Sequence, residues 1–293
     1  MPKIIYLCRQ ENEEAQRTFH NLPFTIYNLS FTTNKIVSFI QYHIENRVAY
    51  ITLNNPQKRN ALSPSLITEL TLSFNNAQED PAVKVIVLRA NGEVFSAGAD
   101  LAYLQQLQNN TYNENLTDSQ HLMTLFNTMH KLQKVIIAQV EGHAIAGGCG
   151  LATICDIVFS TPEAKFGYTE VGIGFVPALV TVFLLRKIGE GNAKDLLLSG
   201  RLIDANEAHR IGMINYVVPA NAIAQTVDTY AQRLCNNAAS EALASTKQLI
   251  ANLQNLGFDE GLHYAAEQNA TARASESCKR GIAAFLNKEK INW

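Results

Sequence analysis

A glycine-rich stretch in the middle of the chain has residue types suited to a ligand that approaches the backbone. The segment EGHAIAGGCGLATICDIVFS, residues 141–160, contains four glycines and three alanines. A predicted strand ends near Glu141 and Gly142, and a predicted helix begins near Gly147, where the first backbone N–H groups have no intrahelical acceptor. Each glycine at a helix start lowers helix propensity by roughly 1 kcal/mol relative to alanine. Close helix packing alone explains only one or two of them.

A second turn of the same kind occurs in VFSAGADLAYLQQL, residues 94–107. A predicted strand runs into Gly98, and Asp100 is placed to cap the following helix, so backbone N–H groups again point out of a strand-to-helix turn. A plain tight turn at Gly98 is the simpler alternative. Two such turns could direct two N–H donors at one oxygen. That arrangement is an oxyanion hole, in which each donor typically lowers the reaction barrier by ~3 kcal/mol.

An acid and a basic pair complete the candidate residues. Glu170 stands among apolar and small residues in AKFGYTEVGIGFVPALVTVFLLRKIG, residues 164–189, and such surroundings raise the pKa of a carboxyl group into a range suited to proton transfer. The alternative is an exposed loop glutamate. Lys58 and Arg59 follow a predicted turn, and a solvated loop is the simpler interpretation of this pair.

The elements that must position these residues alternate between strands and helices, which is typical of a layered α/β core. A helix capped by Ser63 with Pro64 in its first turn is expected over 64–79. After Val218-Pro219 the pattern predicts helices only. The sequence therefore divides into a weakly ordered extension, a core and a helical region, over residues 1–35, 36–220 and 221–293. Strands are expected at 47–55, 83–91, 134–142 and 156–161, and further helices at about 117–133 and from Gly147.

Composition excludes several classes of function. The 293 residues are 47% hydrophobic and carry a formal charge of −2, so no basic field attracts nucleic acid, and no apolar run is long enough to span a membrane. The five cysteines are scattered without a C-x-x-C pair, which favours a reducing, cytoplasmic location over a disulfide framework. The seven histidines form no metal-binding motif, so no metal is expected.

Four motifs in the same order resemble the crotonase superfamily of enoyl-CoA hydratases and isomerases. They are NPQKRNALS, FSAGADL, EGHAIAGGCGLATICDIVFSTPEAKFGYTEVGIGFVP and LLLSGRLIDANEAHRIGMINYVV, and the likeness covers about residues 40–293. The resemblance implies an α/β spiral of repeated ββα units with a C-terminal helical trimerisation region. It also implies a homotrimer or a hexamer made of two trimers, an acyl-CoA thioester as substrate, and no cofactor.

The resemblance also implies roles for individual residues. The oxyanion hole falls on the backbone N–H groups of Ala99 and Gly147, and Glu170 becomes the acid/base. In this reading the glycines stay small so that the thioester carbonyl can reach the backbone, which applies to Gly147 and also to Gly148. The residues expected to bind CoA are Lys58, Arg59, Ala61, Ala97, Asp100 and Leu101.

The chain departs from the typical hydratase pattern at Gly150. Hydratases of this family carry a second glutamate there, whereas a single glutamate suffices to move a double bond. Bacterial relatives that resemble this chain, with glycine here and PA in place of the glycine-rich PGAGG, are described as methylglutaconyl-CoA-type hydratases. If the enzyme is a hydratase, a water or a substrate group is expected to fill the space beside Gly150.

The expected function is hydration of a short or branched 2-enoyl-CoA through a thioester enolate held by the oxyanion hole. The alternative is a Δ3-Δ2 enoyl-CoA isomerase that uses Glu170 as its single base. A less favoured alternative is an acyl-CoA hydrolase or decarboxylase, because the same oxyanion hole serves those reactions. An RNA-binding scaffold is disfavoured, since no basic stripe with interleaved aromatic residues is present.

Overall fold

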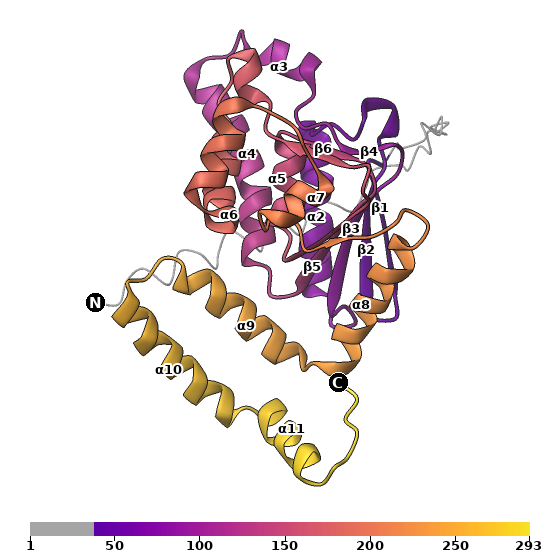
Figure 1. Cartoon of the computed structure of the whole chain (residues 1–293), viewed down its shortest axis with the longest axis vertical. Coiled ribbons are helices and arrows are strands. Elements are labelled where there is room, and N and C mark those ends of the chain that lie inside the picture. Colours follow the sequence, from indigo (N-terminus) through magenta and orange to yellow (C-terminus); the bar gives the residue numbers. More distant parts are fainter. Residues whose placement is uncertain (1–37) are drawn as a thin grey trace, which may run out of the picture. The chain divides into compact units, whose positions relative to one another are not determined.

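A six-stranded sheet lies at the centre of the computed structural model, which describes residues 38–293 (Figure 1). The strand order is β1-β2-β3-β5-β7-β10; β1 and β2 are antiparallel, and the other neighbours are parallel. Four of these strands confirm the predicted ones, and the predicted extension 1–35 lies outside the described residues. The strands are β1 (Ile40–Glu45), β2 (Val48–Leu53), β3 (Val85–Ala90), β5 (Val135–Val140), β7 (Ile157–Ser160) and β10 (Tyr216–Val217).

Both faces of this sheet are covered, which explains why its inner strands are mostly apolar. All six residues of β2 are buried. Ile51 and Leu53 point into the larger core cluster, while Val48 and Tyr50 point into a second cluster on the other face. Successive residues of a strand face opposite sides of a sheet, so a strand covered on both sides needs apolar residues at every position.

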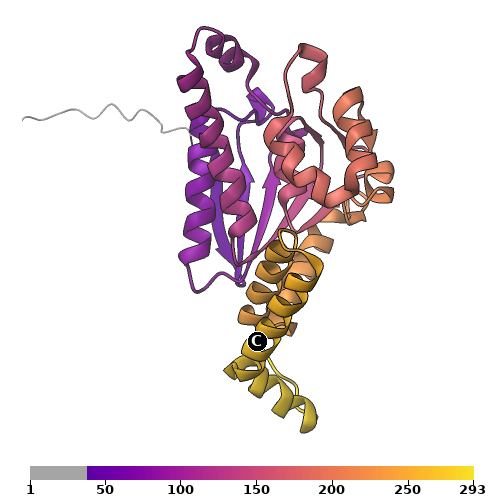
Figure 2. The same cartoon turned by 90° about the vertical axis from the view of Figure 1, so that its left-hand side faces the viewer.

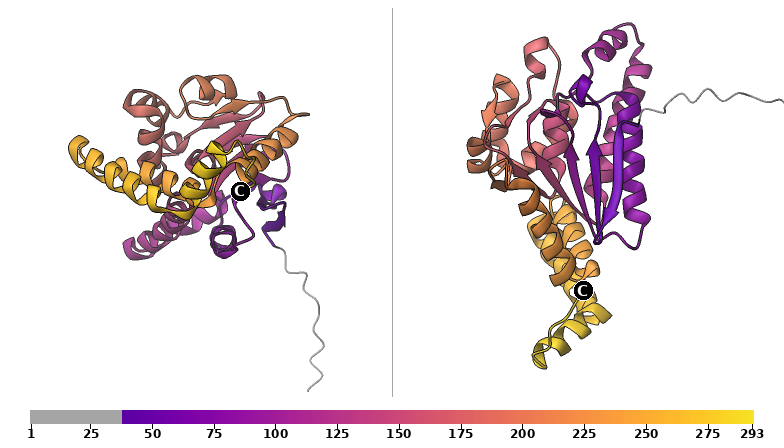
Figure 3. Two further views of the ribbon diagram at one scale, coloured as in Figure 1. Left: turned by 90° about the horizontal axis from the view of Figure 1, so that it is seen from below. Right: turned by 90° about the vertical axis from the view of Figure 1, so that its right-hand side faces the viewer.

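Two helices close these faces. Helix α2 (Pro64–Glu79) lies on the side of the larger cluster and begins as predicted, with Ser63 accepting a hydrogen bond from the Leu66 amide. Helix α8 (Ile223–Asn237) covers the second face through residues spaced four apart, from Ile223 to Cys235. The views in Figures 1 and 3 show the sheet between these two helices.

Helix α4 (Tyr112–Lys131) begins five residues earlier than the sequence pattern suggested. Thr111 accepts a hydrogen bond from the Glu114 amide, and the Glu114 carboxylate accepts one from the Thr111 amide. This capping box satisfies orphan donors at a helix end whose residues are polar, so hydrophobic spacing alone does not reveal it.

A second, four-stranded sheet in the order β4-β6-β8-β9 was not predicted. Its strands have only two or three residues, too few to show an alternating pattern. Strands β4, β6 and β8 lead into the segments that contain Gly98, Gly147 and Glu170 respectively. The strands are β4 (Val94–Ser96), β6 (His143–Ile145), β8 (Lys165–Gly167) and β9 (Ile203–Asp204).

The C-terminal helices leave much of their surface uncovered. The chain becomes wholly helical near residue 220 as predicted, but α8 packs on the sheet, and Ser38–Trp293 form one compact unit. Beyond α8, no residue of α9 is buried, and only Gly261 in α10 and Ala284 in α11 are buried; α10 and α11 extend away from the sheet (Figures 1 and 2). These helices are α9 (Ser240–Leu253), α10 (Phe258–Ala274) and α11 (Glu276–Leu286).

The chain's single tryptophan docks the C-terminus. Arg280 of α11 stacks on the Trp293 ring, with its guanidinium carbon 4.9 Å from the ring centroid, and Gly281 leaves room for the indole. Arg47, in the turn between β1 and β2, donates a hydrogen bond to the Trp293 carbonyl oxygen. The last residue thus ties α11 back to the sheet.

The loop before α2 is held by one buried side chain, Asn60. Its amide nitrogen donates hydrogen bonds to the carbonyl oxygens of Asn91 and Val94, at 2.9 and 2.8 Å, and its amide oxygen accepts one from the Asn55 N–H at 2.8 Å. Asn60 has a φ of 51°, a left-handed conformation that asparagine tolerates better than most residues. This side chain therefore joins the loop to the segment that leads into β4.

We expect Asn60→Ala to destabilise the protein strongly. The substitution leaves two carbonyl oxygens and one N–H group without their partner, and three unsatisfied groups should cost about 3 kcal/mol or more, which lowers the Tm by roughly 10 °C. The matched control is Gln57→Ala in the same loop, since Gln57 is exposed. Thermal unfolding of both variants measures the difference, and equal Tm values would contradict this role for Asn60.

Candidate functional site

Three neighbouring strands of the small sheet bring the predicted catalytic residues to one edge. Strand β6 pairs in parallel with β4 on one side and with β8 on the other. Ser96, Ala144 and Phe166 lie in one row across these strands. Ala99 follows this row by three residues, Gly147 by three and Glu170 by four. Because the carboxyl ends of parallel strands lie on the same edge of a sheet, all three residues follow the same edge.

The two glycine turns touch each other at Gly98. A Cβ atom added to Gly98 would lie 2.8 Å from the Ala146 Cβ, 2.8 Å from the Ile145 carbonyl oxygen and 3.2 Å from the Gly147 nitrogen. Gly98 also has a φ of +81°, which side-chain-bearing residues rarely adopt. The glycine is therefore required both for the turn and for the approach of the two backbones. The plain-turn alternative does not account for this second contact.

The amides of Ala99 and Gly147 are free to bind a ligand. Within residues 38–293, neither donates a hydrogen bond to another residue. Gly147 opens helix α5 (Gly147–Ile154), whose N-cap, Ala146, supplies no side-chain acceptor. The partial positive charge of a helix N-terminus adds to the attraction of these donors for a negatively charged oxygen. These two amides satisfy one requirement of the predicted oxyanion hole, which itself stays a prediction.

Backbone strain accompanies this geometry at Ala146. Its φ of 52° is uncommon for a residue with a side chain and costs on the order of 1–3 kcal/mol. The Ala146 N–H donates to the Gly167 carbonyl at 2.8 Å, and the Ala146 carbonyl accepts from the Gly150 N–H at 3.0 Å. These two hydrogen bonds fix the strained backbone conformation of Ala146. The next N–H group, that of Gly147, therefore points away from the first turn of α5.

The four glycines of residues 141–160 have different reasons to be small. A Cβ atom on Gly142 or Gly148 would overlap a backbone oxygen of the strand segment beside it, from Glu93 or Ser96 respectively. Gly148 therefore allows close packing against β4, which corrects the expectation that it makes room for a ligand. On Gly147, the only atom that an added Cβ would approach is Leu62 Cδ1, at 3.1 Å.

Glu170 is a buried acid with an unpartnered oxygen. It opens the 3-10 turn η2 (Glu170–Ile173) directly after β8, and its side chain is only 9% exposed. Its Oε2 atom is buried and has no hydrogen-bond partner in the described part of the chain. Burial raises the pKa of this carboxyl above its ordinary value of 4.5. Its setting therefore differs from that of an exposed loop glutamate, and it is suited to exchange a proton.

Residues beneath Glu170 form a buried polar layer that the sequence did not reveal. The Tyr168 side chain is fully buried, and its hydroxyl lies 3.1 Å from the Thr153 hydroxyl. Burial raises the pKa of the neighbouring Cys149 thiol to about 12, and the charge of Glu170 acts in the same direction. The thiol is therefore neutral at physiological pH and packs as an apolar group.

The space beside Gly150 is already filled. A Cβ atom on Gly150 would overlap the Cγ1 methyl of Val180 and lie 3.5 Å from Phe126 Cζ. Val180 belongs to helix α6 (Ala178–Ser199) and is 4% exposed. The valine methyl, rather than the expected water or substrate group, therefore takes the position that the first side-chain atom of residue 150 would need.

The residues expected to bind CoA surround the oxyanion-hole turns. Lys58 and Arg59 are exposed, and the Arg59 carbonyl accepts a hydrogen bond from the Ala97 N–H at 3.0 Å. Ala61, two residues after Arg59, is buried. Asp100 caps helix α3 (Leu101–Leu107), as predicted, by accepting hydrogen bonds from the amides of the second and third helical residues. This loop and both glycine turns thus lie side by side, because the Leu62 N–H donates to the Gly98 carbonyl at 2.7 Å.

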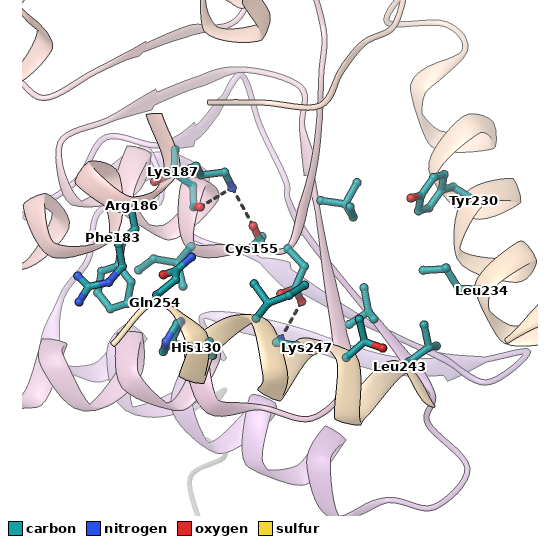
Figure 4. Close-up of a pocket in the computed structure, with 18 residues that line it drawn as sticks. His130, Cys155, Phe183, Arg186, Lys187, Tyr230, Leu234, Leu243, Lys247 and Gln254 are labelled. Carbon is teal, nitrogen blue, oxygen red and sulfur yellow. Dashed lines mark hydrogen bonds and ion pairs between the residues drawn. The ribbon is translucent and has the colours of Figure 1, made fainter. Parts of the chain in front are cut away.

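A separate cavity of about 530 Å³ lies at the opposite end of α5 and contains none of the predicted site residues (Figure 4). Lys187 donates hydrogen bonds to the carbonyl oxygens of Thr153 and Cys155, at 2.6 and 3.0 Å, and Lys247 pairs with Asp156 at 2.7 Å. These cations neutralise the carbonyl end of the helix and the nearby aspartate. The size suits a small ligand, but the charged groups already have partners.

Two further findings concern the described residues alone. Between Ser38 and Trp293, no three His, Cys, Asp or Glu side chains are grouped as metal ligands would be. None of the helices in that segment has the length and apolarity needed to cross a membrane.

The chain is similar to known proteins of one enzyme family. The enoyl-CoA hydratase/isomerase family matches residues 43–293. A Thermus thermophilus protein described as an enoyl-CoA hydratase is 42% identical over 244 residues, covering 83% of this chain and 96% of that protein. The crotonyl-CoA hydratase of Syntrophomonas wolfei is 33% identical over 251 residues, covering 85% and 95%.

Solved structures show the same fold. A Legionella pneumophila protein described as an enoyl-CoA hydratase/isomerase (crotonase) superimposes with a TM-score of 0.80 at 39% identity, covering 87% of this chain and 98% of that one. An enoyl-CoA hydratase from Shewanella pealeana gives a TM-score of 0.83 at 26% identity, covering 88% and 97%. With its crotonase fold and its match over residues 43–293, the chain belongs to the enoyl-CoA hydratase/isomerase family, the crotonase superfamily.

Proposed function

We propose that the protein hydrates a short or branched 2-enoyl-CoA. The observation that supports this most directly is the parallel register of β4, β6 and β8, which gathers two free amides and one buried carboxyl at one edge. Relatives named crotonyl-CoA hydratase and short-chain-enoyl-CoA hydratase support the choice of reaction and of a short acyl chain.

The proposed mechanism uses the thioester carbonyl as the electron acceptor. The amides of Ala99 and Gly147 hold the carbonyl oxygen, and water adds to the β-carbon as the double-bond electrons move toward that oxygen. Fixed N–H donors stabilise the resulting enolate because the negative charge develops where they already point. Glu170 takes one proton from the water and returns a proton to the α-carbon, so a single carboxyl group completes the addition.

Isomerisation of a 3-enoyl-CoA is the second candidate, and the contact between Gly150 and Val180 favours it. Moving the double bond requires Glu170 to take a proton from the α-carbon and return one to the γ-carbon, with a dienolate between the two steps whose oxygen the same two amides would hold. No water takes part. The side chains of Val180 and Phe126 beside Gly150 supply no second polar group to hold a water. Isomerisation by a single base needs neither that group nor the water. Hydrolysis or decarboxylation of an acyl-CoA would use the same two amides.

For the rest of the substrate we propose that CoA binds along the loop containing Lys58, Arg59 and Ala61 and along the backbone of Ala97, Asp100 and Leu101. The exposed cations of this loop suit the phosphate groups, and its hydrogen bonds to the Gly98 turn support a path for the ligand toward Gly147. The proposed chemistry needs no cofactor, because the thioester itself accepts the electrons.

We also propose that the chain assembles as a trimer or as a hexamer of two trimers. Large apolar side chains are exposed on the C-terminal helices, and their burial between subunits would be favourable. These residues are Phe258, Leu262, Ile282, Phe285 and Leu286.

Incubation with enoyl-CoA thioesters in deuterated water should identify the reaction. Hydration consumes the conjugated 2-enoyl-CoA, lowers its absorbance and yields a 3-hydroxyacyl-CoA with deuterium at the α-carbon. A rise in that absorbance from a 3-enoyl-CoA would show isomerisation instead, and free CoA or carbon dioxide would show hydrolysis or decarboxylation.

Glu170→Gln should lower turnover at least ~100-fold, since it retains the shape but accepts no proton. Unchanged turnover in this variant would refute the assigned role.

The raised pKa of Glu170 predicts opposite effects of pH on activity and on stability. The ionised carboxylate is the base, so kcat/KM should rise as the pH passes through the raised pKa. The folded protein holds this proton more tightly than the unfolded chain does. The contribution of this carboxyl to the free energy of unfolding therefore falls as the pH rises over the same range. Glu170→Gln should therefore have a higher Tm than the wild type at pH 8 and a smaller advantage at pH 5. Glu163→Gln, an exposed control, should show no such dependence.

Light scattering in solution should give a mass of about 97 or 194 kDa, three or six times the 32.4 kDa of one chain. Phe285→Glu places a charge on the exposed apolar surface and should shift the protein toward smaller species if that surface is an interface. A monomer at micromolar concentration in the wild type would exclude the proposed assembly.

A further inference from the structure

A segment of the fourth sequence motif lies against the backbone on both sides of Glu170. It comprises residues 199–202, SGRL, and leads from the end of α6 to β9. Before Glu170, a Cβ atom added to Gly167 would lie 2.8 Å from a carbonyl oxygen of this segment. After Glu170, the Val171 side chain reaches Gly200, where an added Cβ atom would lie 3.1 Å from its Cγ2 atom. The backbone that carries the acid/base is therefore packed closely against this segment.

Arg201, which supplies the carbonyl oxygen beside Gly167, joins two helices through its guanidinium group. Its Nε and Nη2 atoms donate hydrogen bonds to Asp195 in α6, at 3.1 and 2.5 Å. Its Nη1 and Nη2 atoms donate to Glu207 in α7 (Ala205–Arg210), at 3.1 and 2.8 Å. These bonds lower the pKa of both carboxyl groups below their ordinary values. A planar guanidinium can bind two carboxylates in this way, whereas the ammonium group of lysine makes no bidentate contact.

The position of the Glu170 carboxyl depends on its backbone. The buried Oε2 atom has no hydrogen-bond partner between Ser38 and Trp293, so no such bond orients this oxygen. Strand β8, which leads to Glu170, pairs with β9 directly after residues 199–202, with Phe166 opposite Ile203. Helix α7 packs against both of these strands. The carboxyl group is therefore placed by the same elements that Arg201 ties together.

We infer that Arg201 is a positioning residue for the acid/base: by tying residues 199–202 to α6 and α7, it holds the backbone of Glu170 in place and keeps the carboxyl group buried. This inference rests on the proposed function, since it assigns a support to the same carboxyl. In the described part of the chain, the guanidinium pairs with carboxylates of α6 and α7 and not with Glu170 itself.

The exposure of the ion pairs separates this role from a general contribution to stability. The side chains of Arg201, Asp195 and Glu207 are 40%, 51% and 28% exposed. Ion pairs that are this accessible to water contribute little to the free energy of unfolding. The loss of Arg201 should therefore change the properties of Glu170 more than it changes the Tm.

The first test measures the Glu170 carboxyl without a substrate. Infrared titration of the full chain gives its pKa, and Glu170→Gln identifies the absorption that belongs to it. In Arg201→Gln the packed segment loses both carboxylate partners, so water should reach Glu170 and its pKa should fall toward the ordinary value of 4.5. Loss of a positive charge alone would raise this pKa, so a fall identifies the loss of burial. An unchanged or higher pKa in the folded variant would overturn the inference.

Two further variants distinguish geometry from charge. Arg210→Gln is the matched control, because Arg210 is 71% exposed and reaches only Glu207, at 3.4 Å. It removes one positive charge from the same group of residues and should leave the pKa of Glu170 unchanged. Arg201→Lys keeps the charge but not the planar fork, so it should lower this pKa as Arg201→Gln does. Should Arg201→Gln fail to fold, Arg201→Lys decides the question, and a wild-type pKa in that variant would overturn the inference.

The second test uses the enzymatic reaction. Arg201→Gln should lower kcat at least ~10-fold, because a displaced base transfers protons poorly. The KM should change less than ~2-fold, since the loop proposed to bind CoA is a different part of the chain. The rise of kcat/KM with pH should begin at a lower pH than in the wild type, following the pKa of the carboxyl. Wild-type kcat in Arg201→Gln would contradict the positioning role.

The two tests separate this inference from the proposed function. A wild type that turns over no enoyl-CoA would refute the proposed function, yet a lower Glu170 pKa in Arg201→Gln would still support the placement of this carboxyl by Arg201. An active wild type with the same pKa and kcat in Arg201→Gln would overturn the inference alone. A large fall in Tm with unchanged pKa and kcat would reduce Arg201 to a residue that stabilises the fold, and would also overturn it.

Discussion

The parallel pairing of three very short strands determines the whole site. Strands β4, β6 and β8 contribute only a few hydrogen bonds. Their register nevertheless decides which residues lie side by side where the three strands end. Ala99, Gly147 and Glu170 come from segments far apart in the sequence, and each follows the end of its own strand by two or three residues. A shift of one residue in any strand would turn an amide or a carboxyl group away from the others, because successive residues face opposite sides.

The site is maintained at a cost in stability. Ala146 has an unfavourable φ, the amides of Ala99 and Gly147 lack acceptors within the described chain, and Glu170 is buried with an unpartnered oxygen. Only a ligand could give the two amides and the Glu170 oxygen the partners that they lack, whereas the strain at Ala146 is a fixed cost of the turn. The buried core on both faces of the six-stranded sheet offsets these local costs, since it is far larger than the site.

One buried and two half-buried lysines elsewhere in the described part of the molecule have a structural explanation. Lys84 donates a hydrogen bond to the Cys235 carbonyl near the end of α8, Lys134 to the Ala77 carbonyl near the end of α2, and Lys187 to carbonyls at the end of α5. An ammonium group beside a helix C-terminus is favoured by the local partial negative charge. The same pattern accounts for the charges in the cavity at the far end of α5, which need no ligand to satisfy them.

Local patterns in the sequence determined the buried strands, helix α2 with its Ser63 cap, the capping role of Asp100 and the apolar setting of Glu170, because each depends on residues close together in the chain. Only the tertiary structure decided the small sheet, whose strands are too short to have a period, and the purpose of each glycine. Gly148 contacts Ser96 and Gly150 contacts Val180. A glycine's neighbours lie tens of residues away in the sequence, so the composition of the segment cannot distinguish a space kept for substrate from one filled by the protein itself.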